Sequence, residues 1–111
     1  MSLTLVNDVN FRMSLRPQGV TLVEFGASWC PPCKVLKPLL DELEESYGER
    51  VTMLEVDCDA SPETASEFGV MSMPTVLVFR HGEPVEKLVG LRPKAVYSSL
   101  LEKYIGIEKP R

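Results

Sequence analysis

The 111-residue chain contains only three cysteines, one histidine and one tryptophan, and it has no apolar run approaching the length needed to cross a bilayer. An odd number of cysteines, two of them three positions apart, argues against a secreted scaffold held together by disulfides. Hydrophobic residues make up 44% of the chain and charged residues 25%, as in an ordinary soluble protein. We therefore expect one domain over residues 1–111, with its own hydrophobic core.

Positive charge is also scarce. The net charge is −4, and the twelve Lys and Arg residues are scattered along the chain. Nucleic acids and anionic membranes attract clustered basic residues, so we expect neither as a partner. Residues 1–10 lack both a charged leader and a long apolar stretch, which predicts no signal peptide. We expect a monomer that acts in the cytoplasm.

Strand and helix patterns alternate along the chain. The predicted elements are a helix over 9–15 capped by Asn7 or Asp8, a strand over Val20–Gly26, a helix from about Pro32 to Gly48, a strand over Val51–Asp57, a helix from Ser61 to about Phe68, a strand over Thr75–Phe79, a turn at His81-Gly82, a strand over Glu83–Val89, and a helix from Pro93 to Gly106. Residues 105–111 are expected to be a frayed tail. This order predicts an α/β fold, with a mixed central sheet covered by helices on both faces.

The strand Val20–Gly26 is apolar on both of its faces except at Glu24, which predicts a central, buried strand. Burying a carboxylate is costly, so we expect Glu24 to have a raised pKa and to be neutral much of the time. The alternative is that its long side chain reaches solvent at the end of the strand.

Cys30 and Cys33 lie where this strand is followed by a helix. A Cys-X-X-Cys pair is also half of a zinc site, but only Cys58 and His81 remain as further ligands, and they form no second pair. We expect no bound metal. Cys30 in the first helical turn faces free backbone N–H groups and the positive end of the helix dipole, which stabilise a thiolate. Cys30 is thus the predicted nucleophile, and Cys33, one turn further in and more buried, is the predicted resolving thiol.

Three segments together carry a family resemblance. Phe25–Lys34 with Pro38, then Met73–Thr75, and then Val89–Leu91 resemble the active-site segments of the thioredoxin family in sequence and spacing. The resemblance extends over roughly Leu5 to Ile105. It implies the thioredoxin fold and a thiol–disulfide oxidoreductase that reduces protein disulfides. It also implies that no cofactor is needed beyond the redox-active Cys30–Cys33 disulfide.

The resemblance assigns further roles as well. Glu24 stands where thioredoxins typically have a buried Asp, the proton acceptor for the resolving cysteine, and Pro74 matches a cis proline beside the cysteines. The residues expected to contact substrate are Trp29, Pro32, Met73, Pro74, Gly90 and Leu91. The implied partners are protein disulfides and a thioredoxin reductase, or an equivalent dithiol donor, that restores the reduced state.

The chain departs from the family pattern at several positions. Pro31 replaces the commoner glycine between the cysteines, which stiffens the turn and removes an N–H. Gly26 stands where bacterial thioredoxins often have tryptophan, and we expect looser packing there. Glu55 stands where many carry lysine; near Glu24 it would raise the pKa of one of the two carboxyls. Cys58 is interpreted as a small buried hydrophobe, with a third redox-active thiol as the alternative.

Two other functions remain open at this point. One is a disulfide oxidase or isomerase in an oxidising compartment, which the expected lack of an export signal and the absence of His between the cysteines disfavour. The other is a non-catalytic binding module on the same fold, which the complete cysteine pair, Glu24 and Pro74 disfavour.

Overall fold

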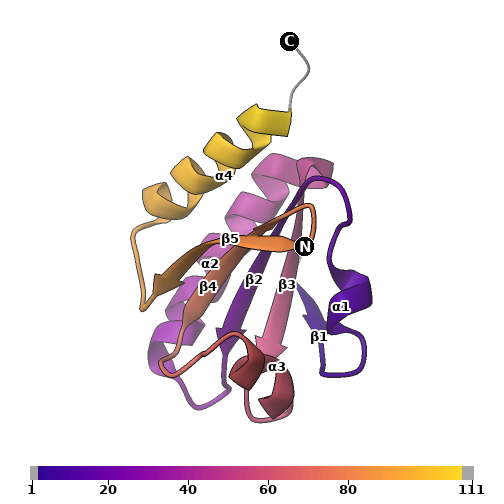
Figure 1. The fold of residues 1–111 in the computed structure, drawn as a ribbon. Helices are drawn as coiled ribbons and strands as arrows, with labels where there is room; N and C mark the ends of the chain where they lie inside the picture. The colour runs from indigo at the N-terminus through magenta and orange to yellow at the C-terminus, as the bar shows by residue number, and fades with distance from the viewer. Residues whose placement is uncertain (1–2, 109–111) are drawn as a thin grey trace.

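The chain folds around one five-stranded sheet with helices on both sides (Figure 1), as seen in a computed structural model that describes residues 3–108. The strands are β1 (Thr4–Val6), β2 (Val20–Gly26), β3 (Val51–Asp57), β4 (Thr75–Arg80) and β5 (Glu83–Val89). The helices are α1 (Phe11–Ser14), α2 (Pro31–Tyr47), α3 (Pro62–Glu67) and α4 (Lys94–Glu108), with a short 3-10 turn at Gly48–Arg50.

The order of the strands in the sheet is β1-β3-β2-β4-β5, which places β2 at the centre. β3 runs parallel to β1 and β2, whereas β4 is antiparallel to β2 and β5. The sheet is therefore mixed, and the fold class predicted from the sequence is confirmed. In this register Glu24 of β2 pairs with Glu55 of β3 on one side and with Val76 of β4 on the other.

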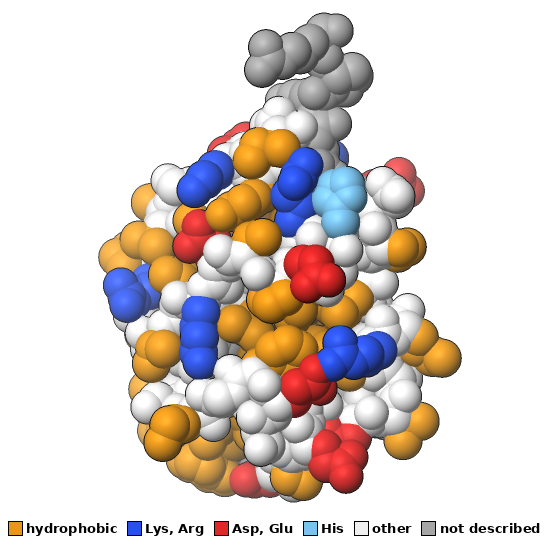
Figure 2. All heavy atoms as spheres, viewed as in Figure 1, with side chains coloured by type: hydrophobic (Ala, Val, Ile, Leu, Met, Phe, Trp, Pro, Cys, Tyr) orange, Lys and Arg blue, Asp and Glu red, His pale blue; other side chains and the backbone are white. Residues whose placement is uncertain are grey.

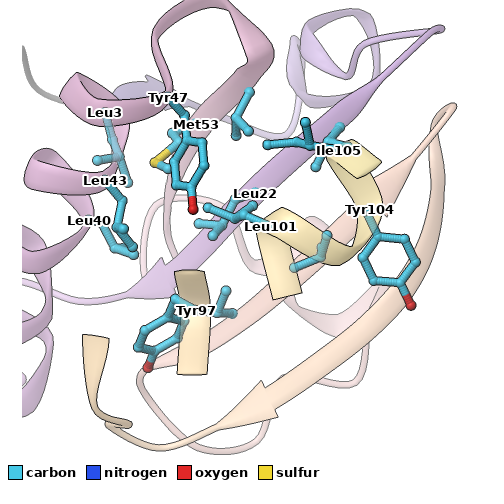
Figure 3. Packing of buried hydrophobic residues seen from close by; sticks show 14 of the residues in the cluster. Leu3, Leu22, Leu40, Leu43, Tyr47, Met53, Tyr97, Leu101, Tyr104 and Ile105 are labelled. Atoms are coloured by element: carbon cyan, nitrogen blue, oxygen red, sulfur yellow. The ribbon is translucent and has the colours of Figure 1, made fainter. Parts of the chain in front are cut away.

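Helices α2 and α4 cover one face of the sheet. Leu40 of α2, Leu22 of β2 and Leu101 of α4 are each 0% exposed, and Figure 3 shows their side chains gathered between the helices and the sheet. The apolar residues of α2 that face the sheet are Leu36, Leu40, Leu43 and Tyr47, all of them buried. α2 thus lies directly against the central strand, which brings its first turn close to the end of β2.

Helices α1 and α3 cover the opposite face, where aromatic rings form the core. Phe11 of α1 and Phe68, just after α3, have ring centroids 5.5 Å apart, and Phe68 packs edge-on against Phe79 of β4 at the same distance. Edge-to-face contacts of this kind are the favoured geometry for aromatic pairs. Both faces of the sheet are therefore buried, as the nearly continuous apolar sequence of β2 requires.

Asp8 provides the hydrogen bonds that the start of α3 needs. Its carboxylate accepts hydrogen bonds from the Thr64 backbone N–H at 2.8 Å, the Thr64 hydroxyl at 2.6 Å and the Glu63 N–H at 3.3 Å. These bonds hold the pKa of Asp8 below its ordinary value, and the bond from the Thr64 hydroxyl has the largest effect. Ser61, directly before α3, makes no capping bond with its side chain. Asn7 or Asp8 was expected to cap the first helix, but the N-cap residue of α1 is Asn10, and Asp8 caps α3 instead.

The structure differs from the predicted elements mainly at the two ends of the chain. β1 is a short edge strand that the sequence pattern did not indicate. α4 does not end at Gly106 but continues to Glu108, and Ile105, expected in a frayed tail, is 5% exposed and part of the core. The remaining predicted tail, residues 109–111, lies outside the described residues. At the other helices the differences are small, since α1 is shorter than expected and α2 begins at Pro31.

The surface carries charges of both signs. On the face shown in Figure 2, Lys and Arg side chains alternate with Asp and Glu around small areas of hydrophobic side chains. Within residues 3–108, no helix combines the length and the apolar character that spanning a membrane would require.

Candidate active site

The cysteine pair lies at the start of α2, immediately after the loop that follows the central strand. Cys30 is the N-cap residue, Pro31 is the first residue of the helix, and the Cys30 sulfur accepts a hydrogen bond from the Cys33 backbone N–H at 3.3 Å. Cys30 and Cys33 are joined by a disulfide, with their Cα atoms 5.3 Å apart. The first turn of the helix therefore directs an N–H group at the Cys30 sulfur, the contact that stabilises a thiolate at this position.

The expected contrast in burial between the two cysteines is absent. Cys30 is 3% exposed and Cys33 is 5% exposed in this oxidised state, so Cys33 is not the more buried of the two. The expectation rested on Cys33 lying one turn further into the helix, but both residues of the disulfide are buried to the same degree. The difference between the two sulfurs lies instead in their contacts, because Cys30 caps the helix whereas Cys33 faces the interior beside β2.

Glu24 is buried in the central strand and is 1% exposed, which excludes the solvent-exposed alternative. Its Oε1 atom has no hydrogen-bond partner among the described residues. The pKa of Glu24 is raised to about 7, mainly by burial and also by the negative charge of Glu55, while the positive charge of Lys37 lowers it in part. The predicted raised pKa is thus confirmed, together with the predicted influence of Glu55. A carboxyl group with this pKa can both accept and release a proton near neutral pH.

Glu24 and Cys33 are brought together by the alternation of side chains along β2. Residues 20 and 22 face α2, whereas 23 and 25 face the other core, so 24 and 26 also lie on the α2 side. A Cβ atom built on Gly26 would overlap Glu24 Oε2 and lie 3.0 Å from Cys33 Sγ. The carboxylate of Glu24 and the sulfur of Cys33 therefore both border the space where Gly26 lacks a side chain. The looser packing expected at this glycine is found only in part, because Glu24 itself occupies much of the space.

Lys37 and Glu55 form an ion pair next to Glu24, with Lys37 Nζ 2.6 Å from Glu55 Oε2. The pair lines a cavity of about 390 Å³ together with Glu24, Gly26 and Cys33. Glu55 is half-buried and Lys37 is exposed, so the cavity leads from the buried carboxyl towards solvent. Lys37 keeps a positive charge close to two carboxylates that would otherwise repel each other.

The residues expected to contact substrate come from three segments: Trp29 and Pro32 beside the cysteines in the chain, Met73 and Pro74 before β4, and Gly90 and Leu91 after β5. Trp29 is 61% exposed, and its indole N–H donates a hydrogen bond to Asp59 at 2.6 Å, which fixes the orientation of the ring. The Met73–Pro74 peptide bond is cis, as the resemblance implied. The Gly90 N–H donates to the Pro74 carbonyl at 2.8 Å, so the loop after β5 is attached to the loop before β4.

The outer residues of this set form an exposed surface. Leu91 is 41% exposed, Met73 and Gly90 are partly exposed, and Pro32 is exposed at the helix start, whereas Pro74 is buried. The Tyr97 hydroxyl holds the Gly90–Arg92 loop, because it accepts from the Arg92 N–H at 3.0 Å and donates to the Gly90 carbonyl at 3.5 Å. These bonds and the Gly90–Pro74 hydrogen bond connect α4, the loop after β5 and the loop before β4.

Cys58 is half-buried and packs against the aromatic core beside α3. The pKa of Cys58 is raised to about 11, first by burial and then by the negative charges of Glu24, Asp57 and Asp59. The thiolate is thus a minor species at neutral pH, which disfavours nucleophilic chemistry. Its packing agrees with the role of a small hydrophobe. Among residues 3–108, no three His, Cys, Asp or Glu side chains gather in a group suited to a metal ion.

Comparisons with known proteins agree with this geometry. A family model described as "Thioredoxin" matches residues 2–103. The chain is 44% identical to a thioredoxin of Staphylococcus saprophyticus over 105 residues, which cover 95% of this chain and 100% of the relative. It is 41% identical to one of Staphylococcus aureus over the same shares of the two chains. The chain belongs to the thioredoxin family.

A solved structure supports the same assignment. A single-residue mutant of thioredoxin from Halobacterium salinarum superposes with a TM-score of 0.86 at 29% identity, over 99% of this chain and 94% of that one. The thioredoxin fold predicted from the sequence is thus confirmed, and the chain is a thiol–disulfide oxidoreductase of thioredoxin type.

Two neighbours of the site were not found by sequence reasoning. Lys37 was not considered, although it lies one helical turn after Cys33 on α2 and therefore above the same part of β2. Asp59 was assigned no role in the site, yet it accepts a hydrogen bond from the Trp29 indole, 30 residues away in the sequence.

The raised pKa of Glu24 predicts a pH-dependent stability. Glu24 keeps its proton in the folded state up to about pH 7, whereas an unfolded chain loses it near its ordinary value of 4.5. The stability of the parent relative to Glu24→Gln should therefore fall by on the order of 3 kcal/mol as the pH rises through this window. Urea denaturation of both oxidised proteins at several pH values measures this difference, and a pH-independent difference would contradict the burial argument.

Proposed function

We propose that this protein reduces disulfides of other proteins, with Cys30 as the nucleophile and Cys33 as the resolving thiol. The cysteine pair at the helix N-terminus carries this proposal, because an N–H of the first turn points at the Cys30 sulfur. The family assignment supports protein substrates and a reductase as electron donor. The two sulfurs store the electrons, so the cycle uses no organic cofactor and no metal.

The reaction proceeds in two steps. The reduced Cys30 thiolate attacks one sulfur of the substrate disulfide, a mixed disulfide forms, and the other substrate sulfur leaves as a thiolate. Cys33 then loses its proton and attacks Cys30, which re-forms the Cys30–Cys33 disulfide and releases the second substrate thiolate. Two electrons pass to the substrate, and a thioredoxin reductase or another dithiol donor returns them.

Glu24 is proposed as the proton acceptor of the second step. Its carboxyl group and the Cys33 sulfur both border the space where Gly26 lacks a side chain, close enough for direct contact or for one bridging water. A pKa of about 7 suits the task, since the group is partly ionised at neutral pH and still basic enough to take the proton.

The exposed surface around the disulfide is proposed to bind substrate. Trp29 and Leu91 offer apolar contact, Pro32 borders the disulfide, and the backbone of Met73 offers hydrogen bonds to an extended chain. Pro74 and Gly90, joined by a backbone hydrogen bond, support this surface. We further propose that the chain acts as one domain over residues 1–111, as a cytoplasmic monomer.

The roles of the two cysteines are tested with insulin as the substrate and dithiothreitol as the donor. Cys30→Ser should abolish turnover, because no mixed disulfide can form. Cys33→Ser, reduced and then freed of dithiothreitol before insulin is added, should form the mixed disulfide and stop there, so that a covalent adduct appears by non-reducing mass spectrometry. Cys58→Ser is the control and should keep the parent rate. A parent protein with no turnover above the dithiothreitol background would favour a binding module instead.

The role of Glu24 is tested by a single turnover of the reduced protein with an aromatic disulfide such as 5,5′-dithiobis(2-nitrobenzoate). The first thiolate released reports attack by Cys30, and the second reports resolution by Cys33. Glu24→Gln should leave the first phase unchanged and slow the second by about 100-fold, since loss of a general base typically costs at least this much. Glu45→Gln, the same change at an exposed position of α2, is the matched control. An unchanged second phase with an unchanged pH profile would exclude the base role.

A further inference from the structure

Gly26 is a buried glycine whose backbone does not explain its presence. Among the described residues, five glycines have a positive φ, a conformation that favours glycine, and Gly26 is not one of them. It lies at the end of the central strand, where a residue with a side chain would stabilise the strand better than glycine does. The reason for glycine at this position must therefore lie in the surrounding space.

That space is occupied by two groups of the proposed active site. A Cβ atom at position 26 would overlap Glu24 Oε2, and it would lie 3.0 Å from Cys33 Sγ and 3.3 Å from Cys33 Cβ. Both distances to Cys33 are tighter than ordinary van der Waals contacts, and Cys33 is fixed in the first turn of α2. A side chain at position 26 would therefore displace the carboxyl group of Glu24.

Gly26 also borders the cavity that connects the Glu24 carboxyl to solvent. Glu24, Gly26 and Cys33 form its buried end, whereas Lys34 and Lys37 line it with exposed side chains. A buried acid that accepts a proton in each cycle must return that proton to solvent. The cavity provides room for water along this path.

We propose that Gly26 is a positioning residue for the resolving step. The room left by its missing side chain holds the Glu24 carboxylate beside Cys33, so residues 24 and 26 form a size-matched pair. This inference rests on the proposed role of Glu24 as the base. In the step concerned, the Cys33 thiol gives its proton to Glu24, the Cys33 thiolate displaces the substrate sulfur from Cys30, and Glu24 then releases the proton through the cavity.

The charged and titratable groups around Glu24 come from several elements. They are Cys33 and Lys37 of α2, Glu55 of β3, Cys58 after β3, and Tyr97 of α4. A displaced carboxyl would change its distance to each of them. The pH profile of the resolving step therefore reports the position of the Glu24 carboxyl. A general loss of stability would leave this pH profile unchanged.

The size-matched pair is tested with the variants Gly26→Ala, Glu24→Asp and the double variant, in the same two-phase single turnover. Gly26→Ala should slow the second phase by at least about tenfold, because misplacing a catalytic group by about 1 Å costs up to a hundredfold. The first phase should stay within about twofold of the parent, since Cys30 attack does not use Glu24. The shorter acid of the double variant makes room for the added methyl group, so it should recover most of the lost rate and the pH profile of the parent.

Gly106→Ala is the matched control. Gly106 also has an ordinary φ, and a Cβ there would meet nothing within 4 Å, so this variant should behave like the parent. If Gly26→Ala keeps the parent's second phase and pH profile, the inference is wrong. It is also wrong if the double variant resolves no faster than Gly26→Ala.

Two further outcomes are informative. If Gly26→Ala fails to fold and the double variant folds, stability alone supports the size match of residues 24 and 26. If neither variant folds, the size match is refuted, because the shorter side chain of Glu24→Asp should leave space for the added methyl group. Glu24→Gln separates this inference from the proposed function. If Glu24→Gln has the second-phase rate of the parent, Glu24 is not the base. If Glu24→Gln is slow in the second phase but Gly26→Ala is not, Glu24 remains the base and only the positioning role of Gly26 is excluded.

Discussion

The carboxyl group of Glu24 lies in the middle of the central strand, buried between the sheet and α2, and much of the site is arranged around it. A charge in such a place is unfavourable, so the group holds its proton up to about pH 7. The side chain points to the α2 face because strand residues alternate, and this same face receives the first turn of α2 with Cys33. The fold thus fixes an acid of near-neutral pKa beside the sulfur that must lose a proton.

The neighbours of Glu24 determine how this unfavourable burial is tolerated. Glu55 is its partner in the parallel register and adds negative charge, whereas Lys37 reaches across from α2 and pairs with Glu55. Gly26 leaves space for the longer side chain of a glutamate. These departures from the usual family pattern therefore belong to one local arrangement. Glu24 is longer than the usual Asp, Gly26 lies beside it, and the lysine is Lys37 on α2 rather than a residue at position 55 of β3.

Much of the fold followed from the sequence because its signals are local. β2, β3 and β5 have the predicted bounds, and α2 begins within one residue of the predicted start. β1 was missed because three residues at an edge carry too little alternation to be distinguished from a loop. Gly106 did not end α4, because its φ is not positive and Ile105 before it is anchored in the core. In the site, the raised pKa of Glu24 was predictable from one acid in an apolar strand, but the roles of Lys37 and Asp59 depend on contacts between distant segments.

The most direct measurement is the titration of Glu24 in the oxidised protein by carbon-13 NMR of its side-chain carboxyl, with Glu24→Gln used to assign the signal. The account predicts a midpoint of about 7, set mainly by burial and also by the negative charge of Glu55. A midpoint at the ordinary value of 4.5 would contradict it, because the carboxyl would then be solvated and could not be held over Gly26 as the proton acceptor of Cys33.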